Sequence, residues 1–216
     1  MNTPRHTILA ALPLLAGAML SSAAQAHHGM DGQLPNSLIS GLISGLAHPV
    51  IGLDHLAFLL AAALAVAGTE PAAHARLPWF FVLPSLAAVG WHAAGFDLPG
   101  AEILVALSLI VLALLLIRRR ASQTRLLLPL LVAAGLLHGY AYGESIVGAE
   151  PTPLLAYLAG LALVQYSLCL AAILLYRRFV RYWLPGQENP GDTGRRMAGW
   201  AVGGIGGIFL VLAVIG

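Results

Sequence analysis

Two histidines and an aspartate lie close together in an otherwise apolar segment. The run from His48 to His55 reads HPVIGLDH, and uncharged residues follow it up to Gly68. Placing an aspartate near the centre of a bilayer costs about 3 kcal/mol on insertion scales, so such groups are usually there for a function. Imidazole nitrogens and a carboxylate together suit a divalent transition metal. The leading hypothesis is therefore a path for such an ion through a membrane, with His48, Asp54 and His55 at its core.

A second group of potential ligands, His138 and Glu144, lies in a later apolar segment. Six residues on a regular helix separate two side chains by about 120°, so joint ligation requires a distortion near Gly143. If this segment faces the first one, His138 and Glu144 complete a nitrogen and oxygen site. The alternative is a local hydrogen-bonded network at the outer membrane interface, where tyrosines are common.

The remaining histidines are weaker candidates. His27 and His28 follow a predicted cleavage site, and with the new terminal amine they are expected to capture a cation outside the membrane, although chain termini are usually poorly ordered. His92 is a lone imidazole in an apolar segment, where metal ligation competes with ordinary packing. His74 follows Glu70 in an inner loop and is expected to be solvated.

The composition predicts an integral membrane protein. Hydrophobic residues make up 59% of the chain and charged residues 9%, with a mean hydropathy of +0.84, whereas soluble domains carry about 25% charged residues. The basic residues are all arginines in separate clusters, which makes nucleic-acid binding improbable. The single cysteine, Cys169, excludes an intramolecular disulfide and most thiolate metal cages.

The first 26 residues have the pattern of a secretory signal peptide. Arg5 gives a basic start, 8–20 form an apolar centre, and Ala24-Gln25-Ala26 fits the cleavage pattern. The alternative is an uncleaved first membrane helix. Cleavage gives a signal peptide at 1–26 and a single integral membrane domain at 27–216, with its amino terminus outside.

The expected fold class is an all-α membrane protein, a bundle of about six transmembrane helices. The first is expected to be broken at Pro49 and Gly52, because proline and glycine interrupt helices. With the amino terminus outside, every loop that carries arginines falls on the cytoplasmic side, as the positive-inside rule requires of a bacterial-type inner membrane protein. The candidate spans are 37–68, 77–95, 101–117, 126–147, 153–176 and 197–216.

Small-residue spacing indicates close helix contacts. Gly41-x-x-x-Gly45 lies in the first span, and Gly199-x-x-x-Gly203 lies in the last. Glycines four residues apart share one face of a helix and let a second helix approach closely in lipid. Packing is therefore the expected role of these glycines.

At these motifs the chain resembles the HupE/UreJ family of nickel and cobalt permeases. The resemblance rests on the signal, the histidine at the mature terminus, the H-P-x-x-G-x-D-H element at 48–55 and the H-G-x-A-x-G-E element at 138–144. It implies Ni²⁺ or Co²⁺ as transported substrate, no prosthetic group, and metal chaperones of a metalloenzyme maturation system as partners beside the lipid bilayer. It also implies that His48, Asp54 and His55 form the core of the metal path, with His138 and Glu144 contributing.

The chain departs from the family pattern at two places. Phe58-Leu59-Leu60 stands where many members have a methionine shortly after the Asp-His pair, and Tyr142 stands where many have a further histidine. Fewer soft and nitrogen donors imply an altered preference between nickel and cobalt.

Transport is not the only chemistry that these residues allow. Three histidines and a carboxylate also suit an intramembrane zinc-dependent hydrolase, in which zinc activates water. A third hypothesis is a haem-binding electron carrier that uses His48, His55, His92 and His138 as axial ligands. A non-enzymatic permease that moves the ion inward remains the leading prediction.

Overall fold

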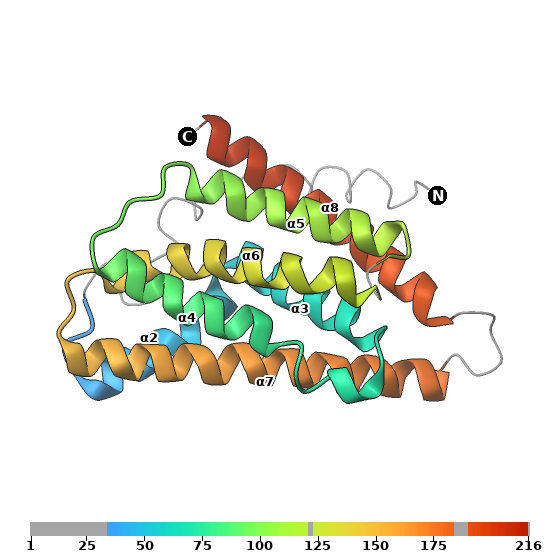
Figure 1. Ribbon diagram of the computed structural model, residues 1–216, viewed down its shortest axis with the longest axis horizontal. Helices are drawn as coiled ribbons and strands as arrows, with labels where there is room; N and C mark the ends of the chain where they lie inside the picture. The colour runs from blue at the N-terminus through green and yellow to red at the C-terminus, as the bar shows by residue number, and fades with distance from the viewer. Residues whose placement is uncertain (1–33, 121–122, 184–189, 216) are drawn as a thin grey trace, which may run out of the picture.

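The computed structural model describes residues 34–120, 123–183 and 190–215, so the predicted signal peptide and His27 and His28 lie outside the described residues. Within these ranges the chain forms α-helices and two short 3₁₀ helices, and the described residues contain no strand. The all-helical prediction is therefore confirmed for this part of the chain. Helices, labelled as in Figure 1, are α2 (Leu38–Ile51), α3 (Leu53–Ala67), η1 (Pro71–Ala73), α4 (Trp79–Ala93), α5 (Ala101–Ile117), α6 (Thr124–Gly143), η2 (Glu144–Ile146), α7 (Pro151–Trp183) and α8 (Pro190–Ile215).

The predicted break in the first apolar segment is present. Helices α2 and α3 meet at an angle of 75°, and Gly52, with ψ near 104° instead of a helical value, is the residue between them. Pro49 lies inside the last turn of α2 rather than at the bend. Helix α2 begins at a capping box in which the Ser37 and Ser40 side chains each satisfy a backbone N–H of the other residue.

Helix α3 lies at the centre of the bundle and contacts α5, α7 and α8. Most of its side chains are buried, including Phe58, Leu59 and Val66. After Asp54 and His55 the helix is apolar on every side, as expected of a largely enclosed helix, although Leu60 is exposed. The central position of α3 brings the Asp54-His55 pair at its start into the interior.

Three helix pairs make the most extensive contacts: α2 with α7, α4 with α6, and α5 with α8. Glycines allow the close approach in each pair. A Cβ atom at Gly45 would lie 2.1 Å from the Tyr157 carbonyl oxygen, and one at Gly139 would lie 2.2 Å from the Ser85 carbonyl oxygen. The packing role predicted for the glycines of the first segment is therefore confirmed at Gly45.

The lengths of the helices fit a membrane protein. Three helices are long and apolar enough to cross a bilayer, and the bent pair α2 and α3 makes a fourth if the two count as one span. Helices α4 and α5 are apolar but shorter, with 15 and 17 residues. All six candidate segments coincide with helices in the described residues, and the number of full crossings stays a prediction.

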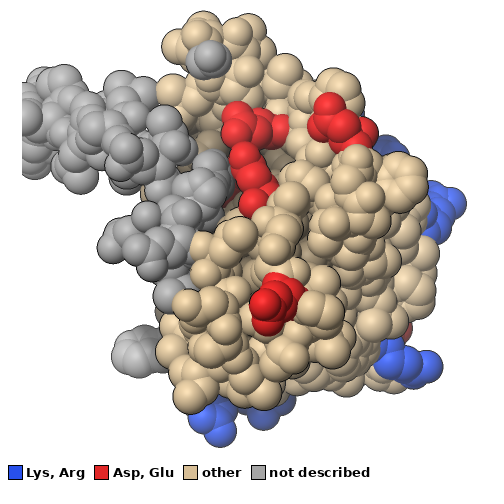
Figure 2. All heavy atoms as spheres, turned by 90° about the vertical axis from the view of Figure 1, so that its left-hand side faces the viewer, with Lys and Arg blue, Asp and Glu red and all other residues tan. Residues whose placement is uncertain are grey.

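The two ends of the bundle differ in charge. The connections from α4 to α5 and from α6 to α7 lie at the left in Figure 1, and they hold or adjoin Asp97, Glu102, Glu144 and Glu150. Figure 2 faces this acidic end and shows acidic side chains across it, with basic side chains only at the rim. Every arginine that the structure describes belongs to the opposite connections, and we call that side the arginine end.

Candidate metal site

Three imidazoles meet inside the bundle where α2 gives way to α3. His48 lies in the last turn of α2, His55 in the first turn of α3, and His138 on α6. Their exposed fractions are 4%, 1% and 0%. The Nδ1 atoms of His55 and His138 are 2.8 Å apart, and the ring centroids of His48 and His55 are 6.0 Å apart. The structure thus brings together three of the predicted site residues, which we call the imidazole cluster.

Hydroxyl groups orient His48. Its Nδ1 lies 3.0 Å from Ser145 Oγ and 3.1 Å from the Tyr157 hydroxyl oxygen. Both hydroxyls are placed to donate their own proton to the Tyr142 carbonyl oxygen, at 3.2 and 2.7 Å. Their oxygens can therefore accept from His48 Nδ1–H. This network assigns the lone pair of the neutral ring to Nε2.

His138 is oriented in the same way. The Ser108 hydroxyl donates to the Val105 carbonyl oxygen at 2.7 Å, so its oxygen accepts from His138 Nε2–H at 3.0 Å. The His138 lone pair is then on Nδ1, the atom that faces His55 Nδ1. His138 Nδ1 therefore accepts the proton of His55 Nδ1–H in this arrangement. Two nitrogens that share a metal at about 2.1 Å are about 3.0–3.4 Å apart. The two Nδ1 atoms could share one ion if they moved apart by about half an ångström and His55 shifted that proton away from Nδ1.

Asp54 supports the start of α3 beside the cluster. Its Oδ1 accepts the His55 backbone N–H at 2.8 Å and lies 3.9 Å from His55 Nδ1. A carboxylate in the first turn also interacts favourably with the helix dipole. Gly52 is required here because a Cβ atom would lie 2.7 Å from the His55 ring. Asp54 therefore accepts an N–H of the first turn of α3 and lies next to a potential ligand.

Tyr142 lies in the middle of the imidazole cluster. Its ring centroid is 5.2 Å from that of His48, 4.4 Å from that of His55 and 6.5 Å from that of His138. The tyrosine is fully buried, and its hydroxyl oxygen makes no hydrogen bond of normal geometry with the described residues. Tyr142 therefore packs against all three imidazoles of the cluster.

A buried amide continues the polar interior beyond Tyr142. Gln165 on α7 is fully buried and lies 2.9 Å from Ser85 Oγ. The Ser85 proton is already directed at the Val82 carbonyl oxygen, at 2.8 Å. If the Gln165 amide is rotated by 180°, its Nε2 donates to Ser85 Oγ and its Oε1 faces the Tyr142 hydroxyl. This orientation satisfies the hydrogen-bonding groups of the amide better. Gln165 then presents its oxygen to Tyr142, whose ring packs against the imidazole cluster.

Two aromatic side chains close the cluster on the side of the arginine end. Phe58 and Phe81 are buried, and their rings stack at 5.3 Å. Their centroids lie 4.6 and 5.6 Å from that of His138. Neither ring offers a polar atom to an ion, so an ion could pass this point only if the rings moved.

Glu144 and His92 lie outside the imidazole cluster. Glu144 is exposed at the acidic end, where it begins the 3₁₀ helix η2, whereas His138 on α6 is buried. His92 Nδ1 lies 2.7 Å from the Tyr140 carbonyl oxygen, and its ring stacks on that of Tyr140 at 4.0 Å. The Tyr140 hydroxyl donates to Asp97 at 3.0 Å. These groups form a separate polar layer near the acidic end.

His74 is not the solvated loop residue expected from the sequence. Its exposed fraction is 7%, and its Nε2 lies 3.1 Å from the Thr69 carbonyl oxygen while Arg177 Nη1 lies 2.9 Å from its Nδ1. The prediction was wrong because the chain after α3 folds back against α7. Within the described ranges no group of three or more His, Cys, Asp or Glu side chains is already arranged as a metal site.

Sequence reasoning missed the neutral polar residues that surround the imidazoles. Gln165 is the only amide in the apolar segment 153–176 and was detectable on that ground. The serines gave no such signal, since a serine in a membrane helix often only bonds its own backbone. The missed residues are Ser85, Ser108, Ser145, Tyr157 and Gln165.

Comparison with known proteins identifies the family of the chain. A model of the family described as HupE / UreJ protein matches residues 14–209, which covers all three imidazoles and most of the helices. Neither a curated protein nor a solved structure matches the chain. This is a transporter-type family of membrane proteins rather than a family of enzymes. Because the match extends over nearly the whole sequence, the chain is an integral membrane protein that belongs to the HupE / UreJ protein family.

Proposed function

We propose that the chain is a permease that moves Ni²⁺ or Co²⁺ inward across a bacterial-type inner membrane through the imidazole cluster. The observation that carries this proposal is the 2.8 Å approach of His55 Nδ1 and His138 Nδ1 in the interior of the bundle. Imidazoles buried in a membrane helix bundle cost free energy, so they are usually there for a function. Nitrogen ligands suit both metals. The family assignment favours transport over the zinc-hydrolase alternative.

The ion enters from the acidic end. Asp97, Glu102, Glu144 and Glu150 give that end a negative field, which concentrates dications near the entrance. His92 and Glu144 belong to this outer stage, where the ion is still hydrated. His27 and His28, which lie outside the described residues, are assigned to capture before entry.

Dehydration takes place at the imidazole cluster. His48 Nε2 and His138 Nδ1 carry lone pairs in the tautomers fixed by Ser145, Tyr157 and Ser108. Such outer hydrogen bonds orient imidazole ligands and raise their basicity. His55 supplies a third ring, and Asp54 balances part of the charge of the ion.

Release follows toward the arginine end. The Gln165 amide and the Tyr142 hydroxyl provide neutral oxygens next to the imidazoles, and movement of Phe58 and Phe81 opens the way onward. An inward-negative potential contributes about 2.3 kcal/mol per charge per 100 mV. Metal chaperones at the arginine end take up the ion and keep its free concentration low.

Uptake of labelled nickel and cobalt tests this proposal, in cells that lack their own carriers. The native chain is compared with His48→Ala, Asp54→Asn and His138→Ala. Removing one nitrogen ligand should reduce uptake at least about tenfold, since one lost ligand costs more than about 1.4 kcal/mol. Cys169→Ala serves as the matched control, because Cys169 is also buried in the apolar core, and among the described residues its thiol has a hydrogen bond only to the Leu59 carbonyl oxygen.

The comparison is made at equal membrane levels of each variant. Full uptake by all three site variants would show that the imidazole cluster is not part of the transport path. Loss of uptake in Cys169→Ala as well would indicate damage to the fold rather than to the site.

A further inference from the structure

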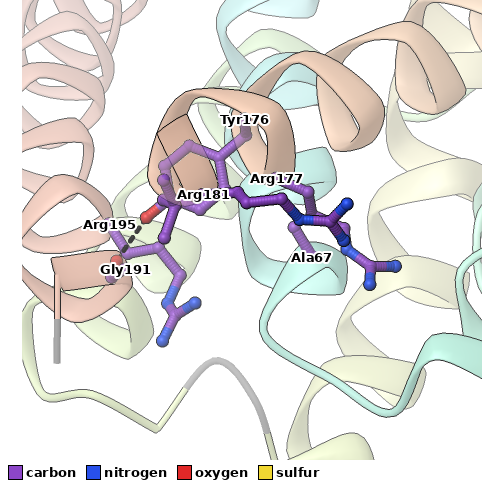
Figure 3. A pocket seen from close by; sticks show the side chains of 7 residues that line it. Ala67, Tyr176, Arg177, Arg181, Gly191 and Arg195 are labelled. Atoms are coloured by element: carbon purple, nitrogen blue, oxygen red, sulfur yellow. Dashed lines mark hydrogen bonds between the residues drawn. The ribbon is translucent and has the colours of Figure 1, made fainter. Parts of the chain in front are cut away.

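A cavity of about 190 Å³ lies at the arginine end between α3, α7 and α8. Ala67 borders it from α3, and Gly191 and Arg195 border it from α8. Tyr176, Arg177 and Arg181 line it from α7 (Figure 3). We call it the arginine pocket, and nothing in the proposed transport path uses it.

The pocket lies at the level where α7 leaves the hydrocarbon. Helix α7 has 33 residues and is about 50 Å long, whereas the hydrocarbon core of a bilayer is about 30 Å thick. The helix carries no charge from Pro151 to Tyr176 and then turns basic at Arg177. Arg177 and Arg181 therefore lie at the depth of the lipid headgroups.

The positive charge of the pocket is only partly balanced. Asp192 forms an ion pair with Arg195, and the Tyr176 hydroxyl donates to the Gly191 carbonyl oxygen. Among the described residues, no carboxylate pairs with Arg177 or Arg181. The contact of Arg177 with His74 Nδ1 does not cancel its charge, because that nitrogen accepts as part of a neutral ring.

Two guanidinium groups therefore share one side of the pocket. Arg177 and Arg181 are four residues apart on one helix, so their side chains are neighbours, and Figure 3 shows both extending away from Arg195. Like charges at this spacing repel each other. An anion bound between them removes the repulsion and accepts several charge-assisted hydrogen bonds.

We propose that the arginine pocket binds the phosphate of an anionic phospholipid. Guanidinium forks match phosphate oxygens, and two unbalanced cations favour a headgroup without an ammonium group. Leu174 precedes Arg177 by three residues on the same face and is 62% exposed, which offers apolar surface to the acyl chain. A free phosphate ion presents the same oxygens but gains nothing from that surface.

Thermal unfolding of the delipidated full-length chain in detergent tests the proposal. Phosphatidylglycerol, phosphatidylcholine and inorganic phosphate are added separately. Phosphatidylglycerol at 100 times its Kd should raise the Tm by about 5–10 °C. Phosphatidylcholine and inorganic phosphate should leave the Tm unchanged.

Paired variants separate the pocket from the general charge of this end. Arg177→Gln with Arg181→Gln should lose the shift caused by phosphatidylglycerol. Arg178→Gln with Arg196→Gln should keep it, since both arginines are exposed and neither lines the pocket. If the first pair does not fold, Arg177→Lys with Arg181→Lys retains the charge but not the forks, and its shift should be smaller than that of the native chain.

Three outcomes overturn the proposal. An equal shift with inorganic phosphate identifies a site for soluble anions, and an equal shift with phosphatidylcholine identifies unspecific lipid binding. If phosphatidylglycerol raises the Tm of either pocket variant as much as that of the native chain, the lipid binds elsewhere. None of these measurements depends on metal transport.

Discussion

At the scale of single residues, hydroxyl groups decide which imidazole nitrogen can bind a metal. Ser108 holds His138, and Ser145 with Tyr157 holds His48, each through a hydroxyl whose own proton points at a backbone carbonyl. A neutral imidazole has one donor and one acceptor, so engaging the donor leaves the other nitrogen as the ligand. Under the proposed function, residues that do not touch the ion therefore determine which imidazole nitrogens are offered to it.

Ser108→Ala tests this dependence. Loss of the hydroxyl releases His138 Nε2–H from its partner and frees the ring to change tautomer. Changes of this kind cost about 10–100-fold in metal affinity or activity, so the KM for nickel or cobalt uptake should rise by that factor. Ser108→Thr keeps the hydroxyl and should retain a KM near that of the native chain. A native KM for the alanine variant would contradict the assigned tautomer.

Tyr142→His adds an imidazole to the cluster. The Tyr142 ring lies 4.4 Å from that of His55, so a histidine there supplies a further nitrogen donor. The KM for uptake should fall and the maximal rate should fall with it, because a tighter site releases its ion more slowly. Tyr142→Phe is the comparison, because it removes the hydroxyl without adding a nitrogen donor. Its KM should not fall, and loss of the hydroxyl from the release path should lower the maximal rate alone. Unaltered kinetics in Tyr142→His would show that the side chain at position 142 does not face the ion.

At the scale of helices, close packing against α7 fixes the position of His48. Gly45 lies one turn before His48 on α2 and touches the α7 backbone at Tyr157, whose hydroxyl contacts the His48 ring. The contact therefore sets both the helix spacing and the imidazole position. The glycine spacing indicated such a contact, but not that α7 was the partner, because apolar helices show no face that identifies their neighbour.

Gly45→Ala should destabilise the protein by about 1–3 kcal/mol, the usual cost of overpacking. A Cβ atom would lie 2.1 Å from a backbone oxygen that cannot move aside alone. Gly204→Ala is the matched control, since a Cβ atom there meets nothing within 4 Å. Thermal unfolding of both purified variants is the measurement. Equal Tm values would show that α2 and α7 do not pack as closely as described.

At the scale of the whole molecule, the sequence predicted the helices better than their arrangement. Apolar segments and the break at Gly52 were readable because composition and backbone preference are local properties. The separation of His92 from the imidazole cluster could not be predicted from the sequence, because it depends on which face of α4 packs against α6. The burial of His74 depends likewise on how a loop folds back.

The charge asymmetry predicts the orientation of the molecule. Glu150 lies at the acidic end and Arg178 at the arginine end. In a Cys169→Ser background, Glu150→Cys should react with a membrane-impermeant thiol reagent in intact cells. Arg178→Cys should react only after the membrane is opened. The reverse pattern would contradict the positive-inside orientation and the proposed inward direction.

The central claim is that one dication binds between His55 and His138. Titration of the purified full-length chain with Co²⁺, followed by visible absorption, tests it most directly, because nitrogen ligation changes the spectrum of the metal. We predict one equivalent of nitrogen-ligated cobalt in the native chain and in Cys169→Ala, and its loss in His55→Ala and His138→Ala. An unchanged cobalt spectrum in both histidine variants would contradict the account.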